Sequence, residues 1–357
     1  MGMPRFTPAL RNFHIRPAHR AVSERVSDVT LLDLTLGCGE YDRTRALADG
    51  RVQVEGVDLR YVTLDPEEVF FRMARHEEFD AAEFSLSSYV VTLCRGGPFV
   101  AIPVFPSKRF RHSCIYVNAR AGIERPADLI GRAVGIPEYQ LTAIVWIRGM
   151  LAEHYGVPVS SVRYRTGGLH DAGRMEKLPV SLPPEIEISP IPSDRVLSDM
   201  LATGEIDALY SPRAPRSLLE GDGAVRCLFA DPRAEERAYF AKTGIFPLMH
   251  AIVLRRDVYT AHRWLANSLV KAFTAAKDLA YEQFRKTAAL EISLPWAREE
   301  YESTVKLLGP DYWAYGLEPN RHALSTFLRY AHEQYLTDRL LAPEDLFARE
   351  TLETVLV

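Results

Sequence analysis

Short apolar runs alternate with amphipathic segments along most of the chain, beginning near residue 28. A short apolar run bounded by turn residues is typical of a buried strand, whereas apolar positions three and four apart are typical of a helix. This pattern predicts three strands, each followed by a helix: strands at 29–37, 57–64 and 80–86, and helices at 41–50, 65–79 and 87–96. Repeated strand-then-helix units favour an α/β fold with mostly parallel sheets.

A second unit of the same kind begins near residue 125. Its pattern predicts further strands at 125–137, 161–166, 206–211 and 250–259, helices at 138–156, 195–205 and 261–287, and a Gly- and Pro-rich loop at 167–185. Two such units leave a cleft at the carboxyl ends of their strands, where α/β proteins bind ligands. The loops that follow the strands are therefore the places to look for chemistry.

Charge and cysteine usage exclude several classes of function. The 357 residues carry a formal net charge of −4, whereas a nucleic-acid partner calls for dense positive charge. The four cysteines are widely spaced and are expected to be free thiols: Cys38, Cys94, Cys114 and Cys227. No histidine, cysteine or carboxylate cluster has metal-ligand spacing, so we predict no metal site.

The beginning of the chain is basic but contains no apolar core of a secretory signal. No apolar run approaches the roughly 20 residues that a membrane-spanning helix needs. We therefore expect a cytoplasmic protein with no membrane partner.

Two of the loops carry side chains suited to binding an anion. Tyr41 and Arg43 follow the first strand at the start of a helix, without the glycine spacing of a nucleotide-binding loop. Three serines follow the third strand: Ser85, Ser87 and Ser88. Hydroxyls at a helix start hold anions or simply cap the helix, and we expect capping by at least one of them.

The stretch "FPSKRFRHSCIYVN", residues 105–118, concentrates positive charge: Lys108, Arg109, Arg111 and His112. A buried cation without a partner costs on the order of several kcal/mol. The stretch is therefore either a solvated crossover between the two units or an anion-binding segment, and guanidinium groups suit carboxylates. On a regular strand Arg109 and Arg111 share one face while Lys108 and His112 share the other, so the four converge only if the segment bends.

The remaining candidates lie in the second unit and near the last strand. We expect the helix after Pro137 to open with Glu138, Tyr139, Gln140 and Thr142, and Tyr139 and Gln140 to face the cleft. An acid at a helix start also stabilises the helix alone. Arg213 follows a strand on a proline-stiffened backbone, and His250 enters a strand, where a lone histidine is more often a core residue than a catalyst. Together the candidates fit a small anionic aromatic ligand.

At these residues the chain resembles the 4,5-dihydroxyphthalate decarboxylases, relatives of the type II periplasmic substrate-binding proteins. The resemblance rests on the segments GEYDRTRAL, FDAAEFSLSSY, FVAIPVFPSKRFRHSCIYVN, GIPEYQLTAIVWIRG, LSDMLATGEIDAL, TGIFPLMHAIV and WAYGLEPNR. It implies an α/β, two-lobed, type II periplasmic-binding-protein-like fold with the ligand cleft between the lobes. The implied division is an N-terminal extension at 1–27, lobe 1 at 28–118 plus 235–357, and an inserted lobe 2 at 119–234.

The resemblance also implies conversion of 4,5-dihydroxyphthalate to protocatechuate and carbon dioxide, without a cofactor. Such chemistry needs a clamp for two adjacent carboxylates and a proton donor for the ring carbon. We assign the clamp to arginines in this order: Arg111 and Arg213, then Arg109 and Arg43. We assign the proton to His112 first and His250 second, and contact with the phenols to Glu138 or Tyr139. The other expected substrate contacts are Tyr41, Ser85, Ser87, Ser88 and Gln140.

Two other functions stay open at this point. One is a decarboxylase or related lyase for another hydroxylated aromatic acid, and the other is the solute receptor of an importer. Fold alone does not separate an enzyme from a receptor, but a receptor is exported and the expected signal peptide is missing. The expected partner is a small aromatic dicarboxylate, and a homo-oligomer is left open.

Overall fold

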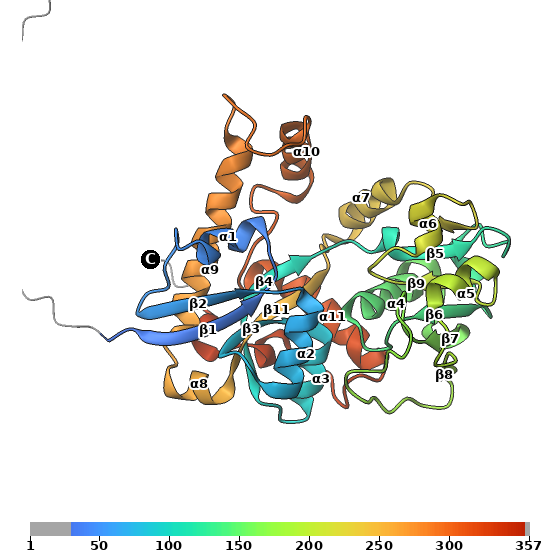
Figure 1. Cartoon of the computed structure of the whole chain (residues 1–357), viewed down its shortest axis with the longest axis horizontal. Coiled ribbons are helices and arrows are strands. Elements are labelled where there is room, and N and C mark those ends of the chain that lie inside the picture. The colour runs from blue at the N-terminus through green and yellow to red at the C-terminus, as the bar shows by residue number, and fades with distance from the viewer. Residues whose placement is uncertain (1–29, 354–357) are drawn as a thin grey trace, which may run out of the picture.

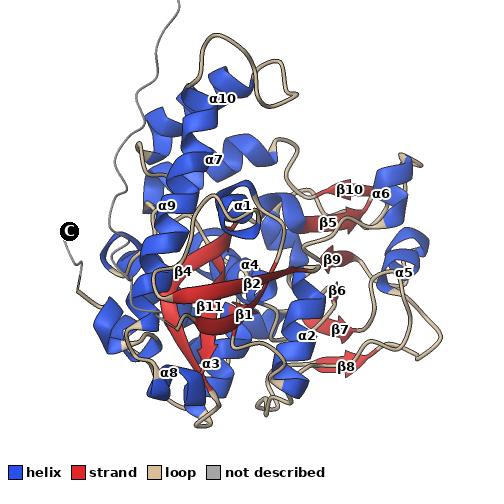
Figure 2. Ribbon diagram, turned by 60° about the vertical axis from the view of Figure 1, so that its left-hand side comes forward, coloured by secondary structure: helices blue, strands red, loops and turns tan. Residues whose placement is uncertain are grey.

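The computed structural model describes residues 30–353, whose strands form two separate sheets (Figures 1 and 2). Sheet A has the order β2-β1-β3-β11-β4: β1 (Leu32–Cys38), β2 (Val57–Thr63), β3 (Ala81–Ser85), β4 (Phe99–Lys108) and β11 (Leu248–Arg255). Sheet B has the order β10-β5-β9-β6-β7-β8: β5 (Ile115–Asn118), β6 (Ala133–Ile136), β7 (Arg163–Thr166), β8 (Ile188–Pro190), β9 (Ala208–Tyr210) and β10 (Val225–Cys227). The predicted N-terminal extension, residues 1–27, lies outside the described residues.

Helices pack around both sheets, and α9 with α10 forms an arm that projects from the body (Figure 1). The helices are α1 (Asp42–Ala48), α2 (Pro66–His76), α3 (Leu86–Cys94), α4 (Thr142–Tyr155), α5 (Leu197–Thr203), α6 (Arg216–Glu220), α7 (Pro232–Thr243), α8 (Arg256–Ala261), α9 (Leu265–Arg285), α10 (Ala297–Leu308) and α11 (Arg321–Glu333). Among these described residues, no helix combines the length and apolar character needed to cross a membrane.

Both sheets are mixed, which refines the predicted α/β class. In sheet A, β1 is parallel to β2 and β3, whereas β11 is antiparallel to both of its neighbours, β3 and β4. In sheet B, β6 is parallel to β7 and β9, whereas β5 is antiparallel to β9 and β10. Sheet A thus draws its strands from both sides of the stretch that builds sheet B.

The predicted division into lobes differs from the sheets at one boundary. Lobe 2 was expected to begin at residue 119, but β5 (Ile115–Asn118) already pairs within sheet B. Strand pairing partners decide the boundary here, and an apolar pattern along the chain does not contain them. The residue boundaries of the two lobes remain our proposal.

Helix starts follow the sequence pattern in one unit and depart from it in the other. Asp65 accepts a hydrogen bond from the backbone N–H of Glu67 and caps α2, and Ser85 caps α3. Contrary to our prediction, α4 begins at Thr142, so residues 138–140 precede the helix. The reason is that the backbone N–H of Tyr139 donates to the carboxylate of Glu176 instead of entering a helical turn.

Buried aromatic side chains tie α4 to sheet A and to α11. Trp146 is 1% exposed, and its ring packs 5.5 Å from Phe327 and 5.7 Å from Tyr330. Its indole N–H donates to the carbonyl oxygen of Leu248 over 2.8 Å. This contact fixes the beginning of β11, two residues before His250.

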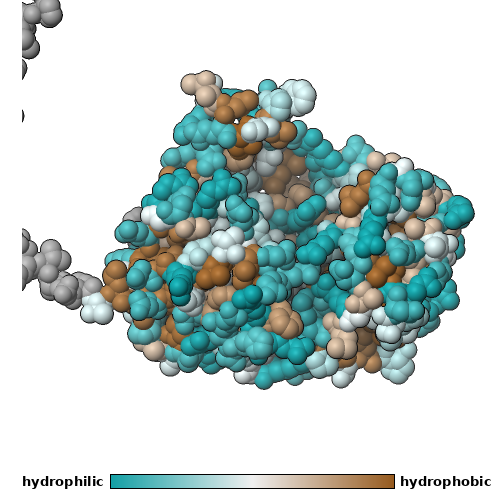
Figure 3. Space-filling model, viewed as in Figure 1, coloured by the Kyte–Doolittle hydropathy of each residue, from teal (hydrophilic) through white to brown (hydrophobic). Residues whose placement is uncertain are grey.

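Hydrophilic residues cover most of the face shown in Figure 3. Apolar side chains gather on the α9–α10 arm (Figure 3). In the loop that connects the two helices, the exposed fractions are 60% for Leu290, 49% for Leu294 and 68% for Trp296. The four cysteines are free, as predicted.

The close approach of α4 and α11 requires glycine at position 149. A Cβ added to Gly149 would overlap the ring of Tyr330. We expect Gly149→Ala to destabilise the protein by about 1–3 kcal/mol, although alanine favours the helix, because overpacking outweighs propensity. Urea unfolding measures the change. Ala152→Gly in the same helix is the control, losing only propensity, and an unchanged stability in Gly149→Ala would contradict this packing.

Candidate active site

A carboxylate, an imidazole and a phenol meet at the carboxyl end of the parallel strands of sheet A. Glu83 of β3 accepts hydrogen bonds from Nδ1 of His250 over 2.6 Å and from the hydroxyl of Tyr41 over 2.8 Å. The backbone N–H of Gly39 donates to the second oxygen of Glu83 over 2.9 Å. We call this group the Glu83 cluster. It includes two residues that the sequence singled out, Tyr41 and His250.

Glu83 is ionised although it is 0% exposed. Burial raises the pKa of its carboxyl group, but the hydrogen bond and charge of His250, with the donors Gly39 and Tyr41, lower that pKa below its ordinary value. Burial and the charge of Glu83 raise the pKa of Tyr41, so its hydroxyl keeps the proton that it donates. The ring of Phe70 lies 4.8 Å from the ring of His250 and holds it edge-on.

Arg43 lies beside the Glu83 cluster between two aromatic rings. Its guanidinium carbon lies 4.2 Å from the centre of the Tyr41 ring and 4.0 Å from that of Trp313. Its Nε donates to the carbonyl oxygen of Pro106, and its Nη1 pairs with Asp42 over 3.1 Å. Stacking and the backbone contact keep this cation in place.

The basic stretch at 105–118 bends, but its charged side chains do not converge on one site. Arg111 is 7% exposed and donates to the sulfur atoms of Met249 over 3.2 Å and Cys114 over 3.6 Å. Within residues 30–353 it makes no ion pair with a carboxylate, and burial lowers its pKa. Arg111 is therefore a buried cation without an anionic partner, whereas Arg109 is exposed.

Lys108 has a structural role at the end of β4. Its amine donates to the carbonyl oxygen of Ala314 and to Oδ1 of Asn320, each over 2.8 Å. Burial lowers the pKa of Lys108 to about 7. The lysine thus anchors the C-terminal segment to sheet A.

His112, our first candidate for the proton donor, packs among aromatic rings and not against the Glu83 cluster. Its ring is 0% exposed and lies 5.3 Å from the rings of Phe229 and Tyr239 and 5.9 Å from that of Tyr155. Neither ring nitrogen has a hydrogen-bond partner in the described part of the chain, and burial lowers the pKa of His112 to about 4. A neutral histidine enclosed by aromatic rings is a core residue, so the structure does not support it as the acid.

The serines meet the start of α4 where the two sheets come together. Oγ of Ser85 and Oγ1 of Thr142 lie 3.0 Å apart, and the backbone N–H of Ser87 donates to the same Thr142 oxygen over 3.0 Å. Ser88 donates to the side-chain oxygen of Gln140 over 3.4 Å. We call this contact the seam. The side-chain oxygens of Ser85, Ser88 and Gln140 thus bind within the seam, whereas Oγ of Ser87 and Nε2 of Gln140 have no hydrogen-bond partner in residues 30–353.

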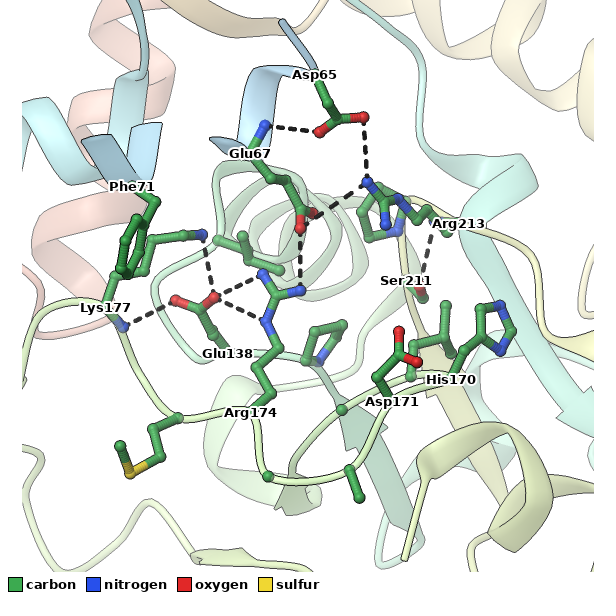
Figure 4. Close-up of a pocket in the computed structure, with 18 of the residues that line it drawn as sticks. Asp65, Glu67, Phe71, Glu138, His170, Asp171, Arg174, Lys177, Ser211 and Arg213 are labelled. Atoms are coloured by element: carbon green, nitrogen blue, oxygen red, sulfur yellow. Dashed lines mark hydrogen bonds and ion pairs between the residues drawn. The ribbon is translucent and has the colours of Figure 1, made fainter. Parts of the chain in front are cut away.

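A cavity of about 600 Å³ lies beside the seam, between the start of α2 and the loops after β6, β7 and β9 (Figure 4). Glu138 lines it but is 1% exposed, and one of its oxygens accepts from Arg174 over 2.7 Å and from Lys177 over 3.0 Å. Arg174 also reaches Glu67 of α2 over 3.2 Å. This ion network joins the two sides of the cavity, so Glu138 already has cationic partners.

Arg213 reaches the same cavity from the end of β9. It lies 3.5 Å from Asp65 and 3.9 Å from Glu67, and its side chain is 57% exposed (Figure 4). Tyr139 is 0% exposed, and the guanidinium carbon of Arg148 lies 3.5 Å from the centre of the Tyr139 ring. We expected Tyr139 to face the cleft, but it does not line this cavity. Its position follows from the turn before α4, which directs the ring inward.

Sequence reasoning missed three charged residues of these sites: Glu83, Arg174 and Lys177. Glu83 interrupts a strand whose five residues are all buried. A carboxylate at such a position needs partners, which was a signal in the sequence. Arg174 and Lys177 lie in the Gly- and Pro-rich loop, where a charge is usually solvated, and their spacing gave no such signal.

Comparison with known proteins gives two curated relatives. The chain is 42% identical over 324 residues to the 4,5-dihydroxyphthalate decarboxylase of Comamonas testosteroni, covering 90% of this chain and 98% of the relative. It is 46% identical over 203 residues to the 4,5-dihydroxyphthalate decarboxylase of Pseudomonas putida, covering 57% of this chain and 79% of the relative. No protein-family model matches the chain.

Solved structures share the fold at low identity. The periplasmic aliphatic sulphonate binding protein SsuA of Escherichia coli has a TM-score of 0.52 at 12% identity, covering 90% of this chain and 99% of that one. A periplasmic sulfonate-binding protein SsuA of Methylobacillus flagellatus has a TM-score of 0.53 at 13% identity, covering 89% and 91%. The two-lobed periplasmic-binding-protein-like fold that we predicted is confirmed.

The ion network across the cavity predicts the effect of losing Arg174. Arg174→Ala leaves the buried carboxylate of Glu138 with Lys177 alone, so we expect a loss of about 2 kcal/mol in urea unfolding. We also expect faster proteolysis within the 167–185 loop. Arg165→Ala is the matched control, because Arg165 pairs with Glu187, which is 56% exposed, over 3.2 Å. Equal losses in the two variants would contradict a special role for Arg174.

The buried, neutral state of His112 predicts a loss of stability in acid. Its folded pKa of about 4 lies below the ordinary 6.5, so the unfolded chain binds the proton more readily. The stabilisation is present above pH 6.5 and is lost as the pH falls toward 4, by on the order of 3 kcal/mol.

His112→Phe should keep the aromatic packing and remove this part of the pH dependence. Urea unfolding between pH 7 and pH 4 measures the difference from the wild type, and His322→Phe, at an exposed position, controls for the change of residue type. The same acid loss in His112→Phe and the wild type would show that His112 is not its source.

Proposed function

The chain belongs to the 4,5-dihydroxyphthalate decarboxylase family, and from this membership we propose that it decarboxylates 4,5-dihydroxyphthalate to protocatechuate and carbon dioxide. The observation that carries the proposal is the 42% identity along 98% of a curated relative with that name. The Glu83 cluster supplies an acid suited to this chemistry, and Arg111, which has no carboxylate partner within residues 30–353, supplies a cation.

The substrate brings two adjacent carboxylates, and a cation without a carboxylate partner is the best suited to bind one of them. Arg111 meets this condition, because its hydrogen bonds go to sulfur atoms. Guanidinium groups bind carboxylates through two parallel hydrogen bonds. We propose Arg111 as one half of the clamp, with Arg43 or Arg213 as the other. The sequence analysis favours Arg213 for this second position, whereas the structure places Arg43 beside the Glu83 cluster.

We propose His250 as the proton donor in place of His112. Nε2 of the imidazolium gives its proton to the ring carbon that bears the leaving carboxylate, so a C–H bond forms as an N–H bond breaks. The C–C bond to the carboxylate then breaks, its electron pair returns to the ring, and carbon dioxide leaves. The hydroxyl para to that carbon stabilises the intermediate. A positioned acid of this kind contributes about 10²–10⁴ in rate.

Substrate entry requires the seam to open. Ser85 of the seam lies in β3 and pairs with His250 of β11. Thr142 of the seam directly follows Leu141, which lines the cavity. The cavity, the seam and His250 are therefore connected through neighbouring residues. We propose that the lobes separate to admit substrate and close around it, which excludes water from the reacting groups.

The first test is an assay of purified, chelator-treated protein with 4,5-dihydroxyphthalate, following protocatechuate and carbon dioxide. We expect turnover without added metal or cofactor. Binding without turnover would favour a receptor, or an enzyme for another hydroxylated aromatic acid. The cytoplasmic location stays part of the proposal, and cell fractionation tests it.

Two histidine variants identify the acid. We expect His250→Gln to lower kcat by about 10²-fold or more with little change in KM, because the variant keeps the volume and loses the proton. His112→Asn is the matched control and should keep most of the turnover. A loss of turnover in His112→Asn, with native folding and an active His250→Gln, would reverse the assignment.

A further inference from the structure

Both oxygens of the Glu83 carboxylate are hydrogen-bonded. Its Oε1 accepts from Tyr41 and His250, and its Oε2 accepts from the N–H of Gly39 and from the thiol of Cys38 over 3.5 Å. The N–H of Gly39 can only donate, and the raised pKa of Tyr41 keeps the hydrogen on its hydroxyl. These contacts favour the ionised carboxylate, in line with its lowered pKa.

His250 is the basic side chain that meets this carboxylate. Among the ion pairs of residues 30–353, Glu83 has His250 as its partner and no lysine or arginine. An isolated buried carboxylate costs on the order of several kcal/mol. A hydrogen on Nδ1 of His250 therefore stabilises the buried carboxylate.

The pair fixes which nitrogen of His250 faces the substrate. Nδ1 points at Glu83, and no residue of the described chain makes a hydrogen bond to Nε2. His250 keeps 18% of its side chain exposed, whereas Glu83 keeps none. Its strand neighbours on the two sides are Ser85 and Ser107. Nε2 is thus the nitrogen left for proton transfer.

We propose that Glu83 is a positioning residue for the decarboxylation: its carboxylate holds the Nδ1–H of His250, so that Nε2 carries the proton that reaches the substrate. This inference rests on the proposed function. Glu83 does not take the proton at any step. After the transfer His250 is neutral with its hydrogen on Nδ1, and solvent returns a proton to Nε2 before the next turnover.

Glu83 is the negatively charged group beside His250, because the other titratable groups that face the Glu83–His250 pair are neutral or positive. Cys38 of β1, Tyr41 before α1 and Tyr61 of β2 all face it, and burial raises the pKa of each, so they stay neutral. Arg43 of α1 adds a positive charge nearby, and α2 contributes the apolar ring of Phe70. Loss of the Glu83 charge should therefore make protonation of His250 harder.

Glu83→Gln tests the proposal, because it keeps the shape and removes the charge. Nitrogen-15 NMR of labelled histidines, with the His250 signal assigned from His250→Gln, follows protonation without any substrate. We expect the pKa of His250 to fall by about 1–3 units in Glu83→Gln. The pH profile of kcat/KM should shift by the same amount, with kcat at pH 7 reduced about 10²-fold or more and KM little changed.

Asp80→Asn is the matched control, since it removes a carboxylate next to the opposite end of β3 that accepts from the N–H and hydroxyl of Thr35. It should leave the His250 signal and the pH profile unchanged. If Glu83→Gln does not fold, the wild type alone decides: a His250 with its hydrogen on Nε2 when neutral would overturn the proposal.

A failure of the proposed decarboxylation can be distinguished from a failure of the proposed role of Glu83. An inactive wild type overturns the proposed decarboxylation. An active wild type whose His250 pKa and pH profile stay the same in Glu83→Gln overturns the role of Glu83 and leaves the proposed function intact.

Discussion

One buried charge determines how the carboxyl end of sheet A is built. Glu83 is 0% exposed and needs donors for both oxygens. Gly39 and Tyr41 come from the chain just after β1, whereas His250 is 167 positions away along the sequence. These segments meet only if β3 lies between β1 and β11, which is the observed order. The strand order that forms sheet A is therefore also the one that gives this carboxylate its hydrogen-bond donors.

Local features of the fold could be predicted from the sequence, because their causes are local. The strand at β1 follows from an apolar run, and the start of α2 follows from Asp65 and Pro66. The site depends on partners far apart in the chain, which spacing does not contain. His112 and His250 look alike in sequence, yet one is enclosed by aromatic rings and the other faces a carboxylate. The recognised family supplied the reaction, and the structure distinguished the histidines.

The polar contacts at the seam and across the cavity are of modest strength. The seam consists of hydrogen bonds between neutral groups, each worth about 1 kcal/mol net, since water replaces them on opening. The ion network at the cavity is partly exposed, with Arg174 at 25%, so solvent weakens it as well. A ligand that binds the closed state better than the open one can therefore shift the balance by its own contacts.

The position of β11 has a consequence for the order in which the chain can fold during synthesis. β11 lies between β3 and β4, but it is made after every strand of sheet B. Until the ribosome has released residues 248–255, β3 and β4 have no strand to join them. Sheet B can pair earlier, from a continuous stretch of chain. His250 arrives with the strand that completes sheet A, so an incomplete chain has neither the finished sheet nor the proposed proton donor.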